Sequence, residues 1–252
     1  MVIVEFGKEN KEVIILLHGG GLSWWNYRDV AEILKRKYHV IIPILDGHAG
    51  SDRDFLSIEK NAEEVIKYID EIHQGFVSCI GGLSLGGQIL VEILSRRKDI
   101  CEFAVIESAL ILPMKVTHFL IKDMINLSYG FIKKQWFSKL QFRELKIKKE
   151  LYEDYYRDSC KITKENMVAF LQANVSYTVK KELEKSNVKS FIFVGEKESA
   201  KMIHSAKRLK ELLPNSELTI MKGRYHGEFS INYATEYANK VIAIMENYNY
   251  LE

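Results

Sequence analysis

The chain has 252 residues, of which 47% are hydrophobic and 28% charged, so it can bury a full core and is not expected to be disordered. Its 36 basic and 34 acidic side chains leave a net charge of +2 and are spread throughout, so we expect no large field of one sign to attract nucleic acid or an anionic membrane. The three cysteines lack C-x-x-C spacing, and their odd number argues against a disulfide framework, so neither that nor a zinc site is expected.

The N-terminal residues 1–6 have neither the basic start nor the long apolar core of a signal peptide. No apolar run approaches the roughly 20 residues that cross a bilayer. The sequence therefore favours a cytoplasmic protein without a membrane span.

Strand and helix patterns alternate along the first 110 residues. Apolar, β-branched runs predict strands at 2–6, 12–17, 38–45, 76–80 and 102–107. Apolar residues that recur every three to four positions predict a crossover helix at 58–72. The run 12–17 is continuously apolar, which is typical of a parallel strand covered on both faces. This βαβ order predicts an α/β fold with a mostly parallel sheet and helices on both faces.

Three glycines follow the strand at 12–17, in the sequence HGGG at residues 18–21. Glycines at this place let a backbone approach a ligand and leave N–H groups unhindered. Alone, the run would be a plain turn, but beside the serine described next it predicts an oxyanion loop. Trp24 and Trp25 follow, and either wall an acyl pocket or pack under the next helix.

The chain is organised around the sequence GLSLG at residues 82–86, which joins the strand at 76–80 to a helical pattern. A serine in such a sharp strand-to-helix turn has a strained backbone, and glycine fits the crowded positions on either side. The turn exposes the hydroxyl and leaves the Leu85 N–H at a helix N-terminus. Ser84 is therefore the predicted nucleophile.

The alternation stops after Ser108, and residues from about 111 to 186 contain only helical patterns, at 116–131, at 139–156 and from Thr163 onward. We expect Met167, Val168, Leu171 and Val175 to form the inner face of the third helix. The basic run at 146–149 is expected to be a solvated helix face. An inserted helical cap explains the interruption.

The alternation resumes at 190–198 with a strand and its exit loop, followed by a helix at 202–213, a strand at 217–221 and a final helix that contains Ile231 and Met245. The chain is thus divided into a core of residues 1–110 and 188–252 and a cap of residues 111–187.

A serine nucleophile needs a base, and the base needs an orienting carboxylate. In an open parallel sheet these groups come from loops at the carboxyl ends of the strands. His226 follows the last strand and Glu198 the strand before it.

The order Ser84, Glu198, His226, with the HGGG loop upstream, resembles the α/β-hydrolase superfamily over essentially the whole chain. The loop at 46–51 is similar to the D-x-x-G-x-G-x-S loop of these enzymes, shifted and with Ala49 inside it. The acid is Glu198 where the family usually has Asp, so Glu107, where some members place the acid, and the neighbouring Glu196 stay open as alternatives.

The resemblance implies a serine hydrolase in which His226 deprotonates Ser84, Glu198 orients His226, and N–H groups of Leu85 and of Gly20 or Gly21 bind the oxyanion. It implies no metal and no cofactor. The expected substrate is a small molecule with a carboxylic ester or thioester and an apolar acyl group. C–C bond hydrolysis, lyase or amidase chemistry with the same residues, a non-catalytic binding protein and a homodimer stay open.

Overall fold

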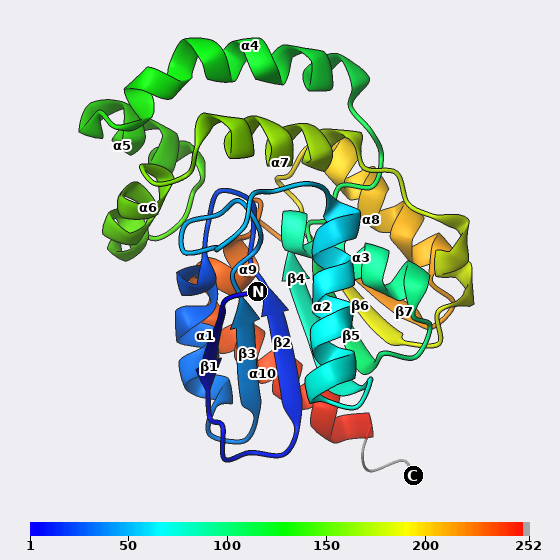
Figure 1. The fold of residues 1–252 in the computed structure, drawn as a ribbon. Helices are drawn as coiled ribbons and strands as arrows, with labels where there is room; N and C mark the ends of the chain where they lie inside the picture. Colours follow the sequence, from blue (N-terminus) through cyan, green and yellow to red (C-terminus); the bar gives the residue numbers. More distant parts are fainter. Residues whose placement is uncertain (249–252) are drawn as a thin grey trace.

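A computed structural model describes residues 1–248 and contains one seven-stranded sheet (Figure 1). The strands are β1 (Ile3–Phe6), β2 (Val13–Leu17), β3 (His39–Pro43), β4 (Val77–Leu83), β5 (Cys101–Glu107), β6 (Lys189–Gly195) and β7 (Ser216–Met221). Their order is β1-β3-β2-β4-β5-β6-β7, and every neighbouring pair is parallel except β1 with β3. The predicted, mostly parallel sheet is confirmed.

The helices around the sheet are α1 (Arg28–Leu34), α2 (Ile58–Ile72), α3 (Leu85–Arg96), α8 (Ala200–Leu212), α9 (Glu228–Asn232) and α10 (Ala234–Tyr248). Side chains of β2 alternate between two cores: Ile15 and Leu17 face α2, α3 and α8, whereas Ile14 and Leu16 face α1 and α10. Each face of the sheet is therefore covered by helices, which explains why β2 is apolar without interruption.

The final helix differs from its prediction. The apolar positions from Ile231 onward indicate one helix, but the structure has two, α9 and α10, with Tyr233 between them in a non-helical conformation. Among the described residues, no helix is long and apolar enough to cross a bilayer.

Between β5 and β6 the chain forms a helical cap of α4 (Lys115–Ile132), α5 (Gln135–Glu144), α6 (Tyr152–Ser159) and α7 (Lys164–Ser176). Figure 1 shows α7 next to the core and α4 outside α7. The division of the chain at residues 110 and 187 stays a prediction, and α4 to α7 lie inside its central part.

One expectation for the cap is wrong, and another is correct only in part. The helical pattern at 139–156 is broken after Glu144, and Lys146 has a φ of +57°, so the basic run at 146–149 is not one helix face. Of the four residues expected on the inner face of α7, Met167 and Leu171 pack against the core but are only partly buried. The fully buried residues of this helix are Asn166 and Phe170. An inner face read from one stripe of apolar residues does not describe a helix packed on two sides.

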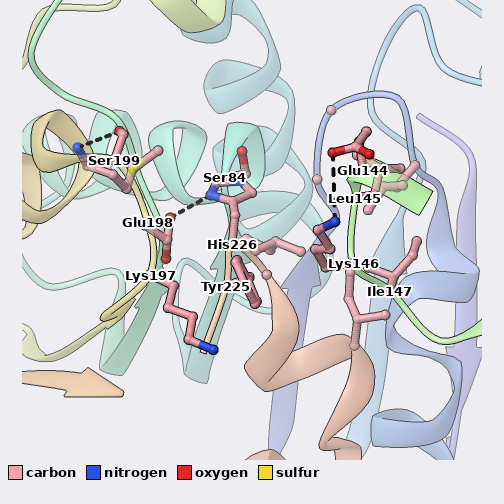
Figure 2. Close-up of a pocket in the computed structure, with 17 residues that line it drawn as sticks. Ser84, Glu144, Leu145, Lys146, Ile147, Lys197, Glu198, Ser199, Tyr225 and His226 are labelled. Carbon is pink, nitrogen blue, oxygen red and sulfur yellow. Dashed lines mark hydrogen bonds and ion pairs between the residues drawn. The ribbon is translucent and has the colours of Figure 1, made fainter. Parts of the chain in front are cut away.

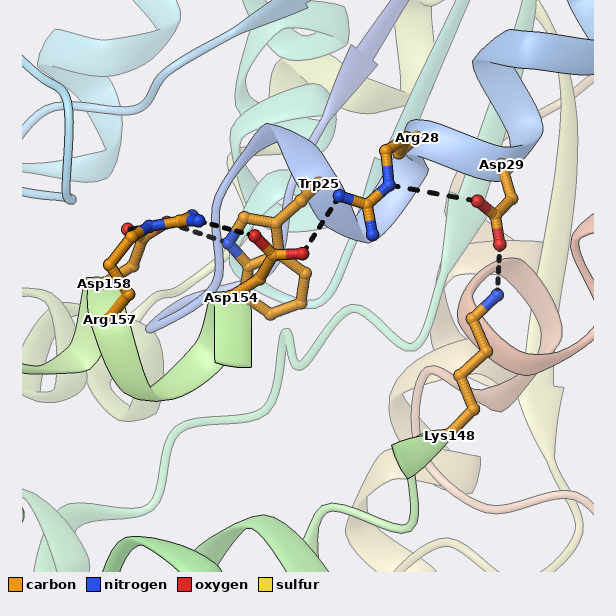
Figure 3. Close-up of polar contacts among 7 residues, drawn as sticks. All are labelled: Trp25, Arg28, Asp29, Lys148, Asp154, Arg157 and Asp158. Carbon is orange, nitrogen blue, oxygen red and sulfur yellow. Dashed lines mark hydrogen bonds and ion pairs between the residues drawn. The ribbon is translucent and has the colours of Figure 1, made fainter. Parts of the chain in front are cut away.

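Trp25 connects the core to the cap through a buried hydrogen bond (Figure 3). Its buried indole N–H donates to Asp158 Oδ2 on α6 over 2.9 Å, and Arg157 donates to the same carboxylate. Close by, Arg28 of α1 donates to Asp154 of α6 over 2.9 Å. Trp25 is buried and lines neither of the two cavities beside the Gly-rich loop. Its observed role is therefore packing and not the lining of an acyl pocket.

Trp25→Phe should lower the free energy of unfolding by about 2 kcal/mol, because the Asp158 carboxylate loses a buried donor. Urea unfolding would measure this fall. Trp24→Phe is the matched control, since the Trp24 indole N–H makes no hydrogen bond among the described residues. Equal destabilisation by the two substitutions would contradict the assignment.

Candidate active site

Ser84 lies in the sharp turn between β4 and α3, with φ +54° and ψ −110°. A Cβ at Gly86 would lie 2.1 Å from the Leu17 carbonyl oxygen, and one at Gly82 would lie 2.4 Å from the Gly86 carbonyl oxygen. Neither position has room for a side chain, which explains the glycine on each side of the serine. The turn holds Ser84 in a conformation that L residues rarely adopt, a strain typical of functional sites.

His226 and Glu198 come from neighbouring loops, after β7 and β6. The imidazole Nδ1–H donates to Glu198 Oε2 over 2.7 Å. Glu198 Oε1 accepts from the Gly195 N–H and from the Ser108 hydroxyl, each over 2.7 Å. Both carboxylate oxygens of this buried side chain are therefore occupied. Among residues 1–248, His226 Nε2 has no hydrogen-bond partner, so this nitrogen is available to a substrate or to Ser84.

Ser84, His226 and Glu198 line one cavity of about 450 Å³ (Figure 2). Within the described part of the chain, the Ser84 hydroxyl makes no hydrogen bond shorter than 3.5 Å. Hydrogen bonds between a nucleophile and its base are often long without substrate and shorten when substrate is present. The arrangement places the hydroxyl of the half-buried Ser84, an imidazole and a buried carboxylate around one cavity.

The two partners shift each other's pKa. Partial desolvation disfavours the charged form of His226, whose side chain is 46% exposed, but the hydrogen bond and negative charge of Glu198 outweigh it and raise the pKa of His226 above its ordinary value. Burial likewise opposes ionisation of Glu198, yet His226 and the Gly195 N–H lower the pKa of that carboxyl. The imidazole is thereby made a stronger base beside Ser84.

Of the three acids left open by the sequence, the structure pairs Glu198 with His226. Glu196 Oε2 instead accepts from the Gly223 N–H over 2.8 Å. Glu107 is buried at the end of β5 and accepts from the Ser230 N–H over 3.3 Å, and burial raises its pKa to about 7.

The Gly-rich loop lies against the start of α3. A Cβ on Gly20 would lie 3.5 Å from Leu85 Cβ, so these two backbones are neighbours, and Gly20 lines the cavity with Ser84. Leu85 is the first residue of α3, where an N–H has no partner within the helix. The Gly21 N–H donates to His48 Nε2 over 3.0 Å. Of the two glycine N–H groups considered as donors to an oxyanion, that of Gly20 is therefore the better candidate.

His18 and His48 are both buried behind this loop. His18 donates from Nδ1 to the Gly19 carbonyl and accepts the Leu45 N–H at Nε2; His48 donates from Nδ1 to the Asp46 carbonyl. Each ring thus has one N–H and one acceptor, which defines a neutral imidazole. Burial lowers the pKa of His18 to about 3 and that of His48 to about 4.

Sequence reasoning missed three features of this site. It assigned no contact to Ser108, which donates to Glu198, nor to His48, whose ring stacks on Phe170 of α7 with centroids 4.6 Å apart. It also missed the cap segment 144–147, which lies across the cavity from Glu198 (Figure 2). Asn232 holds this segment by donating to the Lys146 carbonyl and accepting the Lys148 N–H, each over 2.8 Å.

Comparison with solved structures shows the same fold in proteins of low sequence identity. An esterase from Exiguobacterium antarcticum is 15% identical with a TM-score of 0.82, and a bromoperoxidase from Bacillus anthracis is 18% identical with a TM-score of 0.81; each match covers 97% of this chain and 94% of the other. MenH from S. aureus is 17% identical with a TM-score of 0.77, over 98% of this chain and 97% of its own.

Among curated proteins, the magnesium-chelatase 30 kDa subunit of Rhodobacter capsulatus is 30% identical over 94 residues. That match covers 36% of this chain and only 33% of the length of the relative. A family model described as the alpha/beta hydrolase family matches residues 14–211, which is most of the chain and runs from within β2 to within α8. The chain therefore belongs to the alpha/beta hydrolase family.

Proposed function

We propose that this protein is a serine hydrolase that cleaves a carboxylic ester or thioester through Ser84, His226 and Glu198. The observation that carries the proposal is the hydrogen-bonded chain from Ser108 and Gly195 through Glu198 to His226, ending at the cavity that Ser84 lines. A strained serine that lines a cavity beside an oriented imidazole is the arrangement that nucleophilic catalysis requires.

In this mechanism His226 Nε2 takes the hydroxyl proton as Ser84 Oγ attacks the acyl carbon. The Gly20 and Leu85 N–H groups bind the oxyanion, each worth on the order of 3 kcal/mol. His226 then protonates the leaving alcohol or thiol, and the acyl group stays on Ser84. Water, deprotonated by His226, hydrolyses this acyl-enzyme and restores the serine.

A second, apolar cavity supports a small acyl group. It has a volume of about 160 Å³ and shares Gly20, Leu22 and Leu145 with the larger cavity. An apolar cavity of roughly 150 Å³ is large enough for benzene. The cap supplies most of its lining, which is largely apolar but includes the polar side chains of Gln141, Tyr155 and Ser159; the apolar residues are Ile125, Ile132, Ile162, Met167, Phe170 and Leu171.

The test is reaction with a fluorophosphonate probe, followed by mass spectrometry to locate the adduct. We expect labelling at Ser84 in the wild type and in Ser199→Ala, whose hydroxyl lies by the same cavity but caps α8. Ser84→Ala and His226→Ala should remain unlabelled while retaining the wild-type circular dichroism spectrum. A folded wild type that is not labelled would contradict the proposal and favour a binding protein.

Labelled protein would next be given matched ester, thioester and amide substrates of one acyl group. Faster release from the ester or thioester than from the amide is expected. Turnover of the amide alone would show that the protein cleaves an amide and not an ester or thioester, but it would leave the assignment of Ser84 as nucleophile unchanged.

A further inference from the structure

The outer face of the cap exposes an unusual amount of apolar surface. Sixteen large hydrophobic side chains are exposed among the described residues, and nine of them lie between residues 116 and 145. Eight of these form what we call the apolar patch: Val116, Phe119, Leu120, Met124, Leu127, Phe131, Trp136 and Leu140. Large exposed patches of this kind mark interaction sites.

The patch is continuous because of the helical period. Positions 116, 120, 124, 127 and 131 recur every three or four residues and so share one side of α4. The exposed Asp123, four residues from both Phe119 and Leu127, lies on the same side. Leu127 is 81% exposed and Phe119 76%. Phe131 brings the patch to α5, where the Trp136 ring lies 6.1 Å from the Phe131 ring.

The rest of the fold does not cover this side. The residues of α4 that are buried, Ile121 and Ile132, lie on a different side of the helix from the patch. Figure 1 places α4 as the outermost layer, beyond α7. The patch therefore faces away from the body of the protein.

The charged residues near the apolar patch indicate what kind of partner it binds. Residues 115–143 hold one acidic residue, Asp123, and six basic ones: Lys115, Lys122, Lys133, Lys134, Lys139 and Arg143. This segment carries +5, and since the whole chain carries +2, the remainder carries −3. The even spread of charge expected from the totals is thus wrong for the cap.

These cations are available to a partner. Within the described residues, no carboxylate lies within 4.0 Å of the Lys115, Lys122, Lys133 or Lys134 ammonium groups. Long lysine side chains can keep their charge at a polar boundary while an adjacent apolar surface is buried.

We propose that the outer face of the cap binds an anionic lipid surface. Apolar side chains would enter the boundary between headgroups and acyl chains, and the lysines would contact anionic headgroups, the two signals that together hold a protein on a membrane surface. A second copy fits less well, because it would bring together two cap segments that each carry a net charge of +5. The interaction is with the surface only, and it does not depend on the proposed hydrolysis.

The test is sedimentation of the full chain with vesicles of ether-linked lipids, which contain no ester that the protein could cleave. We expect the wild type to sediment with equimolar phosphatidylglycerol and phosphatidylcholine, about tenfold less with phosphatidylcholine alone, and less as salt rises. Failure to bind the anionic vesicles, or equal binding to both kinds, would overturn the proposal.

Matched variants locate the surface. Met124→Asp in the patch should lower binding about tenfold, whereas Ile72→Asp, at the end of α2, should not; the two side chains are 61% and 60% exposed. The double variant Lys133→Glu with Lys134→Glu should also lose binding. The control double variant Lys207→Glu with Lys222→Glu changes the net charge of the chain by the same amount and should bind like the wild type. Equal effects within either pair would overturn the proposal, as would a dimer in solution that Met124→Asp dissociates.

Discussion

Glu198→Gln is expected to lower kcat/KM for ester hydrolysis about 10⁴-fold, the scale seen when the carboxylate of a Ser-His-acid triad becomes an amide. Glu198 accepts the Nδ1–H of His226, and its other oxygen is held by Ser108 and Gly195. An amide in that place can present its NH₂ to Nδ1, which favours the imidazole tautomer whose Nε2 carries a proton. That tautomer cannot accept the proton of Ser84.

Two matched variants separate the candidate acids in the same assay, hydrolysis of a p-nitrophenyl ester. Glu196→Gln should change kcat/KM less than about twofold, because Glu196 contacts Gly223 rather than His226. Glu107→Gln should have a much smaller effect than Glu198→Gln, because Glu107 acts on His226 only through its charge. A loss of activity in Glu107→Gln that matched that of Glu198→Gln would refute the assignment of the acid.

The free energy of unfolding is expected to fall by on the order of 3 kcal/mol between pH 6.5 and pH 4.5. In the folded state the pKa values of His18 and His48 are lowered to about 3 and about 4. Between pH 6.5 and 4.5 the unfolded chain binds a proton at each histidine and the folded chain does not. Protonation therefore stabilises the unfolded state as the pH falls.

Glu107 acts in the opposite direction over the same range. Its folded pKa of about 7 lies above the ordinary value of 4.5, so the stability that it contributes is present below pH 4.5 and is lost as the pH rises toward 7. Its one proton offsets about half of the effect of the two histidines. The acid loss should therefore be larger in Glu107→Gln, on the order of 5 kcal/mol.

Urea unfolding at the two pH values checks this prediction. The variant His48→Gln keeps an acceptor for the Gly21 N–H but cannot take up a proton, so most of the fall should disappear. A wild type equally stable at pH 6.5 and 4.5 would show that these histidines are not held neutral.

The features that sequence predicted best depend on neighbours along the chain. The turn at Ser84 needs glycine within two residues on each side, and the continuous apolar run of β2 directly reflects burial on both faces. His226 follows the last strand, so parallel topology alone places it at the same edge of the sheet as Ser84.

The features that sequence left open or missed depend on contacts between distant residues. Glu198 and Glu196 are two positions apart, and their hydrogen bonds distinguish their roles: Glu198 contacts His226 and Ser108, whereas Glu196 contacts Gly223. The stacking of His48 on Phe170 joins residues 122 positions apart. The break at Lys146 interrupts a sequence that has a helical period, and the contacts to Asn232 that hold the non-helical segment come from residues more than 80 positions away.

Asn232 links the motion of the cap to the histidine loop. It follows His226 by six residues and holds the cap segment 146–148 through both its amide nitrogen and its amide oxygen. To widen the cavity on this side, that segment must break both hydrogen bonds or carry α9 with it. In the proposed enzyme, movement of the segment to let product leave would therefore also disturb the loop that carries the general base His226. The rate of product release would then depend partly on the Asn232 side chain.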